Sequence, residues 1–427
     1  MRTKHSLDRR NGQVLIMATM SLMLTFGVIG LAVDVGWAHF RKTACYTVAQ
    51  SAAIAGARAA KVVADPSCGG GLTCQAPTAC PATLSTPANP IHAACLYAQQ
   101  NGFTNGGTKG VLIGQNTSGP PIPGTAPSLW VSATVTENLP LTFLAVLGQS
   151  WVNVAARSTA GVQNGDNCIY ALDPARAGSI SNQNAVTSSC GLVADSNSAT
   201  AVQAGPGITA PSVSMVGGYS GTIHGTISTG IASVPDPLAY LPTPSSAGPC
   251  TYTGYNKSAG AVTLNPGKFC GGMNITGTGN VTLNPGMYVL MGGGLNLINN
   301  GQLHGNGVTI FNTFDGTHPY GPIYNQDNAI IDLVAPTSGT YAGILFFNDR
   351  AAPYTPDNIL GAASARLQGS LYFPSSSLVF SSGAWVPVAY TIIVSRTFNN
   401  QINGVTINND YSSLANGSPI KDIAIYE

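Results

Sequence analysis

The chain has 427 residues, of which 8% are charged and 44% are hydrophobic, and it contains 51 glycines. Its net charge of +1 gives no electrostatic basis for binding nucleic acid, and its hydrophobic content argues against disorder over most of its length. This length allows two or three domains, and the scarcity of charge together with abundant Gly, Ser, Thr and Asn predicts a turn-rich β protein.

Residues 14–33 carry no charged side chain. An apolar helix of this length matches the hydrocarbon core of a bilayer, so we predict a transmembrane helix over 13–35. Arg9 and Arg10 precede it and Asp34 follows it, so the positive-inside tendency keeps the N-terminus in the cytoplasm and exports the rest. The apolar residues expected to anchor the chain are Val14, Leu15, Ile16, Leu22, Leu24, Phe26, Val28, Ile29, Leu31 and Val33.

A cleaved signal peptide is the alternative explanation of this segment. The apolar run is longer than the hydrophobic region of about 7–15 residues that signal peptides carry, and no clear A-x-A cleavage site follows it. We therefore expect an uncut membrane anchor.

The helix is expected to continue beyond the membrane through an extension over 36–62, because no proline occurs between Gly12 and Asp65. Nearly every residue of 52–60 is Ala or Gly, which permits close approach of a second helix or a sheet. Two helices separated by a break near Asp34 are the alternative. A stripe at three- and four-residue spacing comprises Val33, Trp37, Phe40, Ala44, Val48, Ala52, Ala55 and Ala59.

An ordered set of features in the first 60 residues resembles the N-terminal region of the TadE/TadG-like proteins of tight-adherence (Flp) pilus assembly. The set consists of the basic Arg-Arg-Asn-Gly-Gln at 9–13, the apolar run, Asp-Val-Gly at 34–36 and the Ala-rich segment at 49–60. The exported remainder resembles the Gly/Ser/Asn-rich regions of some members. This resemblance implies an envelope protein of a pilus or secretion system with a pilin-like N-terminal helix.

Gly12 is the position at which the sequence departs from type IV prepilins, which are cut after a Gly and carry Glu at the fifth mature position. A cut after Gly12 would place Met17 there. Without that carboxylate we expect the chain to stay uncut, with residues 1–12 as a cytoplasmic basic segment.

Residues 63–165 are predicted to form an α+β, pilin-like domain that opens with a Cys-rich loop. Apolar and polar residues alternate at 129–137 and again at 151–162, as in half-buried strands. Helices are expected at 91–100 and, capped by Asn138, in the segment that ends at Gly148, which lies between the two strands. The resemblance implies the same class of fold for this part.

Residues 166–427 are predicted to form a right-handed β-solenoid, because the sequence repeats at about the length of one coil. Val-Thr-Leu-Asn-Pro-Gly at 262–267 recurs at 281–286, 19 positions later (281 − 262), and Gly-Gly-Met-Asn-Ile at 271–275 resembles Gly-Gly-Leu-Asn-Leu at 293–297. Asn-Pro-Gly suits a type II corner turn, and Gly292-Gly293-Gly294 is read as another corner.

Short apolar strands separated by Gly, Asn and Pro continue this pattern toward the C-terminus. A β-sandwich with similar turns is the alternative. The segments expected to form further coils are 308–312, 329–335, 343–348, 369–374, 377–382, 390–395 and 404–409.

Nine cysteines occur without a C-x-x-C pair or a nearby set of histidines, so an oxidising compartment explains them better than a metal site. Cys168 with Cys190 and Cys250 with Cys270 are candidate disulfides. Cys45 is left over. Cys68, Cys74, Cys80 and Cys95 allow three pairings that the sequence leaves open.

No pattern of catalytic residues stands out, and we expect neither an enzyme nor a bound cofactor or metal. G-x-S-x-G, HExxH and a phosphate-binding loop are all absent from the sequence. One cluster of ionisable residues is closer in sequence than the others, and we interpret its members as solvated loop residues: Asp315, His318, Asp327 and Asp332.

Two functions of different class remain open. The first is a membrane-anchored, exported structural or adhesive component of a Tad/Flp-type pilus system, whose partners are the cell membrane, other pilus-system proteins through the N-terminal helix and, as a candidate ligand, surface polysaccharide. The second is an anchored carbohydrate-active enzyme on a β-solenoid, which would need carboxylates within about 10 Å of one another.

Overall fold

The computed structural model describes residues 11–63, 68, 72–116, 129–354, 358–361, 364–381 and 383–426. It divides into two compact units, each described here by itself. The first comprises Met1–Gln163 and Ile423–Glu427, and the second comprises Asn164–Asp422.

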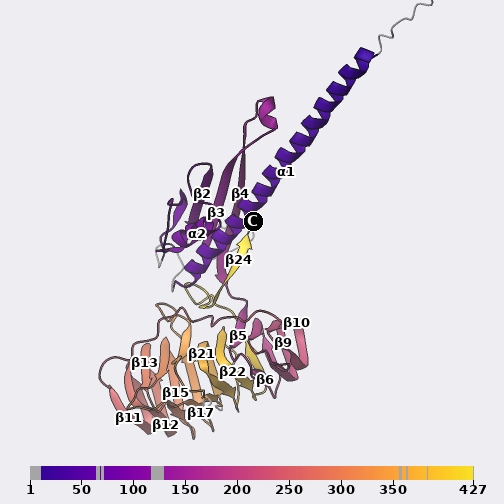
Figure 1. Ribbon diagram of the computed structural model, residues 1–427. Coiled ribbons are helices and arrows are strands. Elements are labelled where there is room, and N and C mark those ends of the chain that lie inside the picture. The colour runs from indigo at the N-terminus through magenta and orange to yellow at the C-terminus, as the bar shows by residue number, and fades with distance from the viewer. Residues whose placement is uncertain are drawn as a thin grey trace, which may run out of the picture. The chain divides into compact units, whose positions relative to one another are not determined.

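The described part of the first unit combines two helices with a five-stranded sheet in the order β1-β2-β3-β4-β24 (Figure 1). The pairs β1–β2, β2–β3 and β3–β4 are antiparallel. The helices are α1 (Asn11–Lys61) and α2 (Pro90–Gln100), with a short 3-10 turn, η1 (Leu144–Leu147), at the tip of the β3–β4 hairpin. The strands are β1 (Gln75–Ala79), β2 (Lys109–Asn116), β3 (Leu129–Pro140), β4 (Trp151–Asn164) and β24 (Lys421–Tyr426).

Helix α1 runs without interruption through Asp34, so the alternative of two helices is wrong. Its C-terminal half is buried on the Ala-rich side, where Ala52, Ala53 and Ala57 have no exposed surface and the helix packs on α2 and β3. A Cβ at Gly56 would lie 2.8 Å from Cγ1 of Val131, so this glycine permits the close approach of helix and sheet. The small residues therefore serve as a packing surface inside the unit.

Two expectations for this unit need correction. Asn138 does not cap a helix, because β3 continues to Pro140 and the 3-10 turn begins only at Leu144. The predicted apolar stripe is buried only in its C-terminal part, since Trp37 and Phe40 are 49% and 59% exposed. The spacing of the stripe fixes which side chains share a face of α1, but it does not show how far the sheet extends along that face.

The second unit is built from strands whose determined pairings are all parallel. An antiparallel sandwich would have the opposite strand direction in neighbouring strands. The strands are β5 (Asn167–Ala171), β6 (Ile180–Asn182), β7 (Val186–Ser188), β8 (Gly191–Ala194), β9 (Val202–Met215), β10 (Tyr219–Thr229), β11 (Tyr252–Leu264), β12 (Gly267–Leu283), β13 (Gly286–Met291), β14 (Leu295–Leu297), β15 (Gln302–Asn306), β16 (Val308–Thr313), β17 (Ile323–Asn325), β18 (Ile330–Val334), β19 (Ile344–Asn348), β20 (Asn358–Leu360), β21 (Ser364–Phe380), β22 (Thr391–Asn400) and β23 (Val405–Ile407).

The repeated segments of the sequence pair with one another in register. Val262 lies opposite Val281 in the β11–β12 pair, and Met273 lies opposite Leu295 in the β12–β14 pair. Gly292, Gly293 and Gly294, which the sequence suggested as a corner, have positive φ values near +70°. Gly286 of the Asn-Pro-Gly repeat has a φ of +139°, which differs from the value near +80° of a type II turn.

The parallel pairings follow three series. The first runs β12–β13–β16–β19–β21, the second β12–β14–β17–β20–β21 and the third β12–β15–β18–β21. Because the long strands β12 and β21 each belong to more than one series, the strand order closes on itself as in a barrel. The first strands of the unit join the last, since β5 and β6 pair with β22 and β7 pairs with β23.

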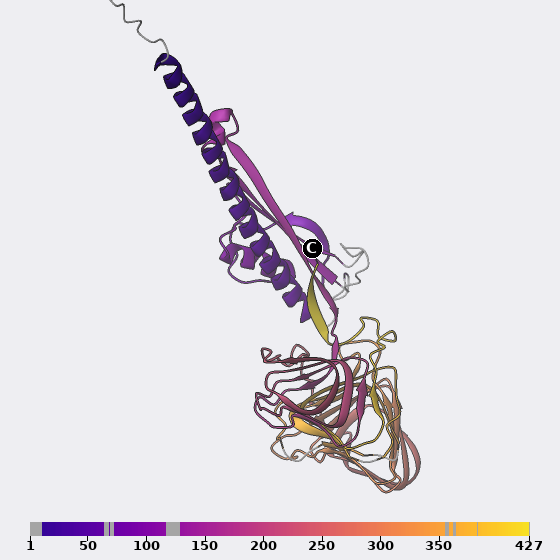
Figure 2. The same cartoon turned by 90° about the vertical axis from the view of Figure 1, so that its right-hand side faces the viewer.

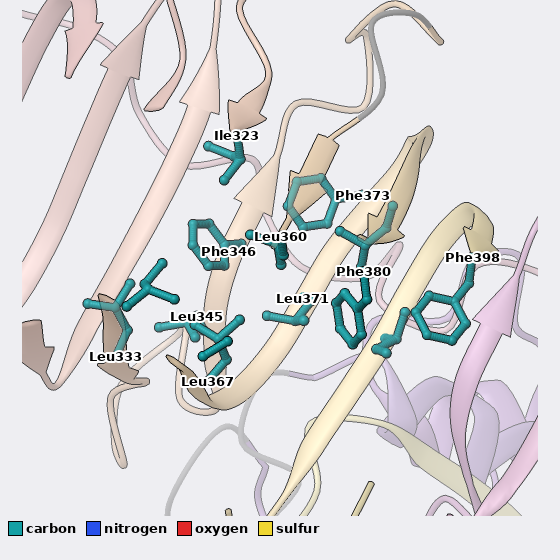
Figure 3. Close-up of a cluster of buried hydrophobic side chains, with 14 of the residues drawn as sticks. Ile323, Leu333, Leu345, Phe346, Leu360, Leu367, Leu371, Phe373, Phe380 and Phe398 are labelled. Atoms are coloured by element: carbon teal, nitrogen blue, oxygen red, sulfur yellow. The ribbon is translucent and has the colours of Figure 1, made fainter. Parts of the chain in front are cut away.

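Apolar side chains from all three series fill the interior of the second unit (Figure 3). Figure 3 shows Phe346, Leu371 and Phe380 projecting from neighbouring strands into one cluster. Phe380 stacks on Trp385 with ring centroids 4.9 Å apart and meets Phe398 edge-on at 5.2 Å. In strands such as β17 and β18, every second residue is buried, so each of these strands supplies alternate side chains to a shared core.

Buried tyrosines make the stability of the second unit depend on alkaline pH. Burial raises the pKa of Tyr288 to about 12, and its single hydroxyl hydrogen is shared between the carbonyl oxygens of Leu264 and Asn284, each 2.8 Å from the hydroxyl oxygen. Burial also raises the pKa of Tyr411 to about 12. Since an unfolded tyrosine titrates near pH 10, this contribution is complete below about pH 10 and is lost as the pH rises through about 12.

We therefore expect the urea midpoint of the second unit to fall progressively between pH 10 and pH 12. Absorbance at 295 nm, which reports tyrosinate, should show a group of tyrosines that ionise only on unfolding. Ionisation of every tyrosine near pH 10 with an unchanged urea midpoint would contradict the expectation.

Candidate membrane-anchoring site

The N-terminal half of α1 presents apolar side chains that the rest of the described chain leaves uncovered. The predicted anchor residues from Val14 to Val33 are 46–74% exposed, and the helix is long and apolar enough to cross a membrane. Exposed apolar surface on this scale is unfavourable in water but favourable in a bilayer. Arg9 and Arg10, the expected topology charges, lie outside the described residues.

Asp34 is engaged by the tip of the β3–β4 hairpin and is only 5% exposed. Its Oδ2 accepts hydrogen bonds from the backbone N–H groups of Phe143 and Leu144 at 2.9 and 2.8 Å, and its Oδ1 accepts one from Thr142 at 3.2 Å. The carboxylate thus takes the place of an N-cap for η1, although it comes from a different element. Asp34 was expected only to influence membrane topology, but its hydrogen bonds also hold the β3–β4 hairpin against α1.

Gly30 lies one helical turn before Asp34 and contacts the same hairpin. A Cβ at this position would lie 2.5 Å from Cγ of Phe143, so only a glycine lets the ring rest against the helix backbone. Figures 1 and 2 both show the hairpin tip beside α1. Two neighbouring positions of α1 therefore hold the tip of the β3–β4 hairpin. Gly30 leaves room for the ring of Phe143, and Asp34 accepts hydrogen bonds from the backbone of the tip.

Arg41 joins α1 to the end of β3 two turns beyond Asp34. Its Nε donates to Glu137 Oε2 at 2.9 Å and its Nη2 donates to Glu137 Oε1 at 2.8 Å, which is a bidentate pair. The guanidinium also lies 5.9 Å from the ring of Trp37 and 5.5 Å from that of Phe103. The side chain of Glu137 is only 8% exposed, so Arg41 compensates a largely buried carboxylate.

Cys45, the cysteine left over by the sequence, is free and fully buried in the core of the first unit. Burial, assisted by the charge of Glu137, raises the pKa of its thiol. Because the thiolate is the reactive form, we expect Cys45 to resist a maleimide reagent at pH 7 in the folded protein and to react after unfolding in urea. Labelling of the folded protein at the rate of a free thiol, followed by mass spectrometry, would be the opposite result.

Four disulfides occur in the structure: Cys68–Cys74, Cys80–Cys95, Cys168–Cys190 and Cys250–Cys270. Cys168 lies in β5, and Cys190 directly precedes β8, which pairs with β5. Cys250 similarly precedes β11, which pairs with the strand that contains Cys270. A separation of 22 or 20 residues therefore joins cysteines of neighbouring parallel strands.

Two of the acidic residues that the sequence singled out, Asp332 and Asp315, have separate local partners. Asp332 on β18 forms an ion pair with Arg366 at 2.8 Å. Asp315 accepts backbone hydrogen bonds from His318 and Thr317, which lower the pKa of its carboxyl. Asp327 has a φ of +56°, a turn conformation.

Among the described residues, the potential metal ligands found together in a group of three are Cys250, Cys270 and His318. Because Cys250 and Cys270 form a disulfide, their sulfurs are not available as thiolate ligands. A cavity of about 580 Å³ in the first unit has no ionisable side chain in its lining, which includes Leu72, Gln115 and Ile91. Neither place presents the paired carboxylates of a glycoside hydrolase.

Residues 12–59 match the family model described as "Putative Flp pilus-assembly TadE/G-like". The match covers the apolar half of α1, Asp34, Arg41 and the Ala-rich surface, and it agrees with the resemblance seen in the sequence. No curated protein and no solved structure matches the chain.

Proposed function

We propose that this protein is a membrane-anchored, exported structural or adhesive component of a Tad/Flp-type pilus-assembly system, without catalytic activity. The observation that carries the proposal is the position of the family match, because residues 12–59 are the segment in which α1 changes from exposed apolar residues to a buried Ala-rich surface. The N-terminal part of α1 is suited to contact lipid, and its C-terminal part packs in the core of the first unit.

The proposed orientation keeps the N-terminus in the cytoplasm and the body outside. Basic residues before the apolar run and their scarcity directly after it support this direction. The four disulfides support it independently, because disulfides persist in oxidising compartments.

We propose further that the closed parallel network of the second unit is a right-handed β-solenoid. Three series of parallel pairings and the in-register repeat are features of stacked coils, and parallel crossovers are right-handed in nearly all proteins. Asn274 donates to Asn256 at 3.0 Å and accepts from Asn296 at 2.6 Å, which forms a ladder of equivalent side chains. Such a body would serve as a spacer or as a contact surface, with surface polysaccharide as a candidate ligand.

The experiment that tests this function is co-purification with tagged pilus-system proteins from membranes solubilised in mild detergent. Leu24 is 74% exposed near the middle of the apolar run, and Leu24→Lys should weaken membrane retention because a central Lys costs about 3 kcal/mol. Leu24→Ile is the matched control. Recovery of pilus components with the wild type and Leu24→Ile supports the proposal, and their absence from both would refute it.

The alternative of a carbohydrate-active enzyme makes a separate prediction. An activity on a polysaccharide that disappears in Asp327→Ala and Asp332→Ala, with unchanged circular dichroism, would replace the structural function. We expect no such activity, because Asp332 is engaged by Arg366 and Asp327 lies in a turn.

A further inference from the structure

The tip of the β3–β4 hairpin lies at the depth of the apolar run of α1. It touches the helix at Gly30, three residues before the last apolar residue, Val33. At about 1.5 Å per residue, this contact lies roughly 4.5 Å inside the end of the run. A helix placed in a bilayer over residues 14–33 would therefore bring the hairpin tip to the membrane surface.

The tip exposes large apolar side chains together with the uncharged polar residues Thr142, Gln149 and Ser150. Residues 141–151 contain no charged side chain. Val146 is 86% exposed, Phe143 46% and Trp151 53%. On α1, Trp37 lies about 10 Å along the helix beyond Gly30 and is 49% exposed, so α1 also carries an exposed aromatic residue just after the apolar run. Aromatic residues gather at membrane interfaces in this way.

Several backbone N–H groups of the tip have hydrogen-bond acceptors, either on α1 or within the loop. Asp34 accepts from the N–H groups of Thr142, Phe143 and Leu144. Further N–H groups are used within the loop, where Val146 donates to the carbonyl of Phe143 and Gly148 to that of Ala145. An unpaired N–H costs several kcal/mol in a bilayer, so this pairing makes burial of the loop in lipid feasible.

We propose that residues 141–151 insert into the outer leaflet beside α1 and form a second contact of the chain with lipid. This inference rests on the proposed membrane anchor. We infer that the loop contacts lipid because it lies beside the lipid-facing surface of α1 at the same depth. Asp34 then has a specific role: it satisfies the loop backbone, while its own charge is kept from the hydrocarbon.

A fluorophore at Val146 tests the depth of the loop directly. The full-length protein in a Cys45→Ala background, with its disulfides oxidised, is labelled with NBD at Val146→Cys and placed in phosphatidylethanolamine–phosphatidylglycerol vesicles. Substitution at a residue that is 86% exposed should not disturb folding. Val28→Cys, on the apolar run, and Val62→Cys, at the other end of α1, are matched references that are 62% and 56% exposed.

We expect a lipid carrying a shallow doxyl group to quench NBD at Val146 and at Val28, and to leave NBD at Val62 unchanged. Quenching at Val28 with a response at Val146 equal to that at Val62 would overturn the inference while the anchor stands. A disulfide-linked dimer through Val146→Cys without quenching would assign the loop to a second copy and also overturn it. Loss of quenching at Val28 itself would refute the anchor and, with it, the inference.

Discussion

Replacing Phe380 with alanine is expected to lower the free energy of unfolding of the second unit by about 3–5 kcal/mol. Phe380 has no exposed surface and its ring packs between Trp385 and Phe398. Its removal leaves a cavity that the surrounding strands cannot close, because β20, β21 and β22 are fixed by their mutual hydrogen bonds. Urea denaturation followed by circular dichroism measures the change.

Val379→Ala is the control for this prediction. Val379 precedes Phe380 in β21, so its side chain points to the opposite face, and it is only partly buried. We expect it to lose clearly less stability than Phe380→Ala. Equal losses for the two variants would mean that the interior cluster does not carry the stability of this unit.

Replacing Arg41 with methionine is expected to destabilise the first unit by about 3 kcal/mol, the lower end of the range for a buried ion pair, since Arg41 is itself 21% exposed. The loss arises because the carboxylate of Glu137 stays buried without its two hydrogen bonds. Thermal unfolding of the full chain in detergent measures it.

The double variant Arg41→Met/Glu137→Gln separates the charge from the packing. Because it removes the uncompensated carboxylate, it should recover a substantial part of the lost stability. Arg41→Lys should fall between the wild type and Arg41→Met, since Lys cannot form the bidentate pair. If the double variant is no more stable than Arg41→Met, the buried charge is not the cause.

Periodic features of the sequence predicted much of the fold. The strands at 129–137 and 151–162 and the helix at 91–100 were confirmed as β3, β4 and α2, with boundaries that differ by a few residues. The repeat at 262–267 and 281–286 predicted two segments that pair side by side. Such features could be predicted because each depends on the spacing of neighbouring residues.

Contacts between residues far apart in the chain could not be predicted from the sequence. The hydrogen bonds of Asp34 reach residues more than 100 positions away, so no local pattern shows that this aspartate caps η1. The sequence placed all of 166–427 in one β domain, whereas β24 joins the edge of the sheet of the first unit next to β4. Its alternating pattern fits either sheet, and tertiary packing decides between them.

The sequence predicted where the candidate anchor lies, but not its contact with the β3–β4 hairpin. The apolar run from Val14 to Val33 is exposed except at Gly30, where Phe143 covers the helix, as a lipid-facing helix requires. The contact of Gly30 with Phe143 was not predicted, because a glycine in an apolar helix has several uses and the partner lies on a distant hairpin.

The topology of the membrane anchor is tested most directly by labelling introduced cysteines with a membrane-impermeant maleimide on intact spheroplasts. Ser258→Cys, at an exposed position on β11, should react at once, whereas Lys4→Cys should react only after the membrane is permeabilised. Reaction of Lys4→Cys before permeabilisation, or protection of Ser258→Cys, would contradict the proposed orientation.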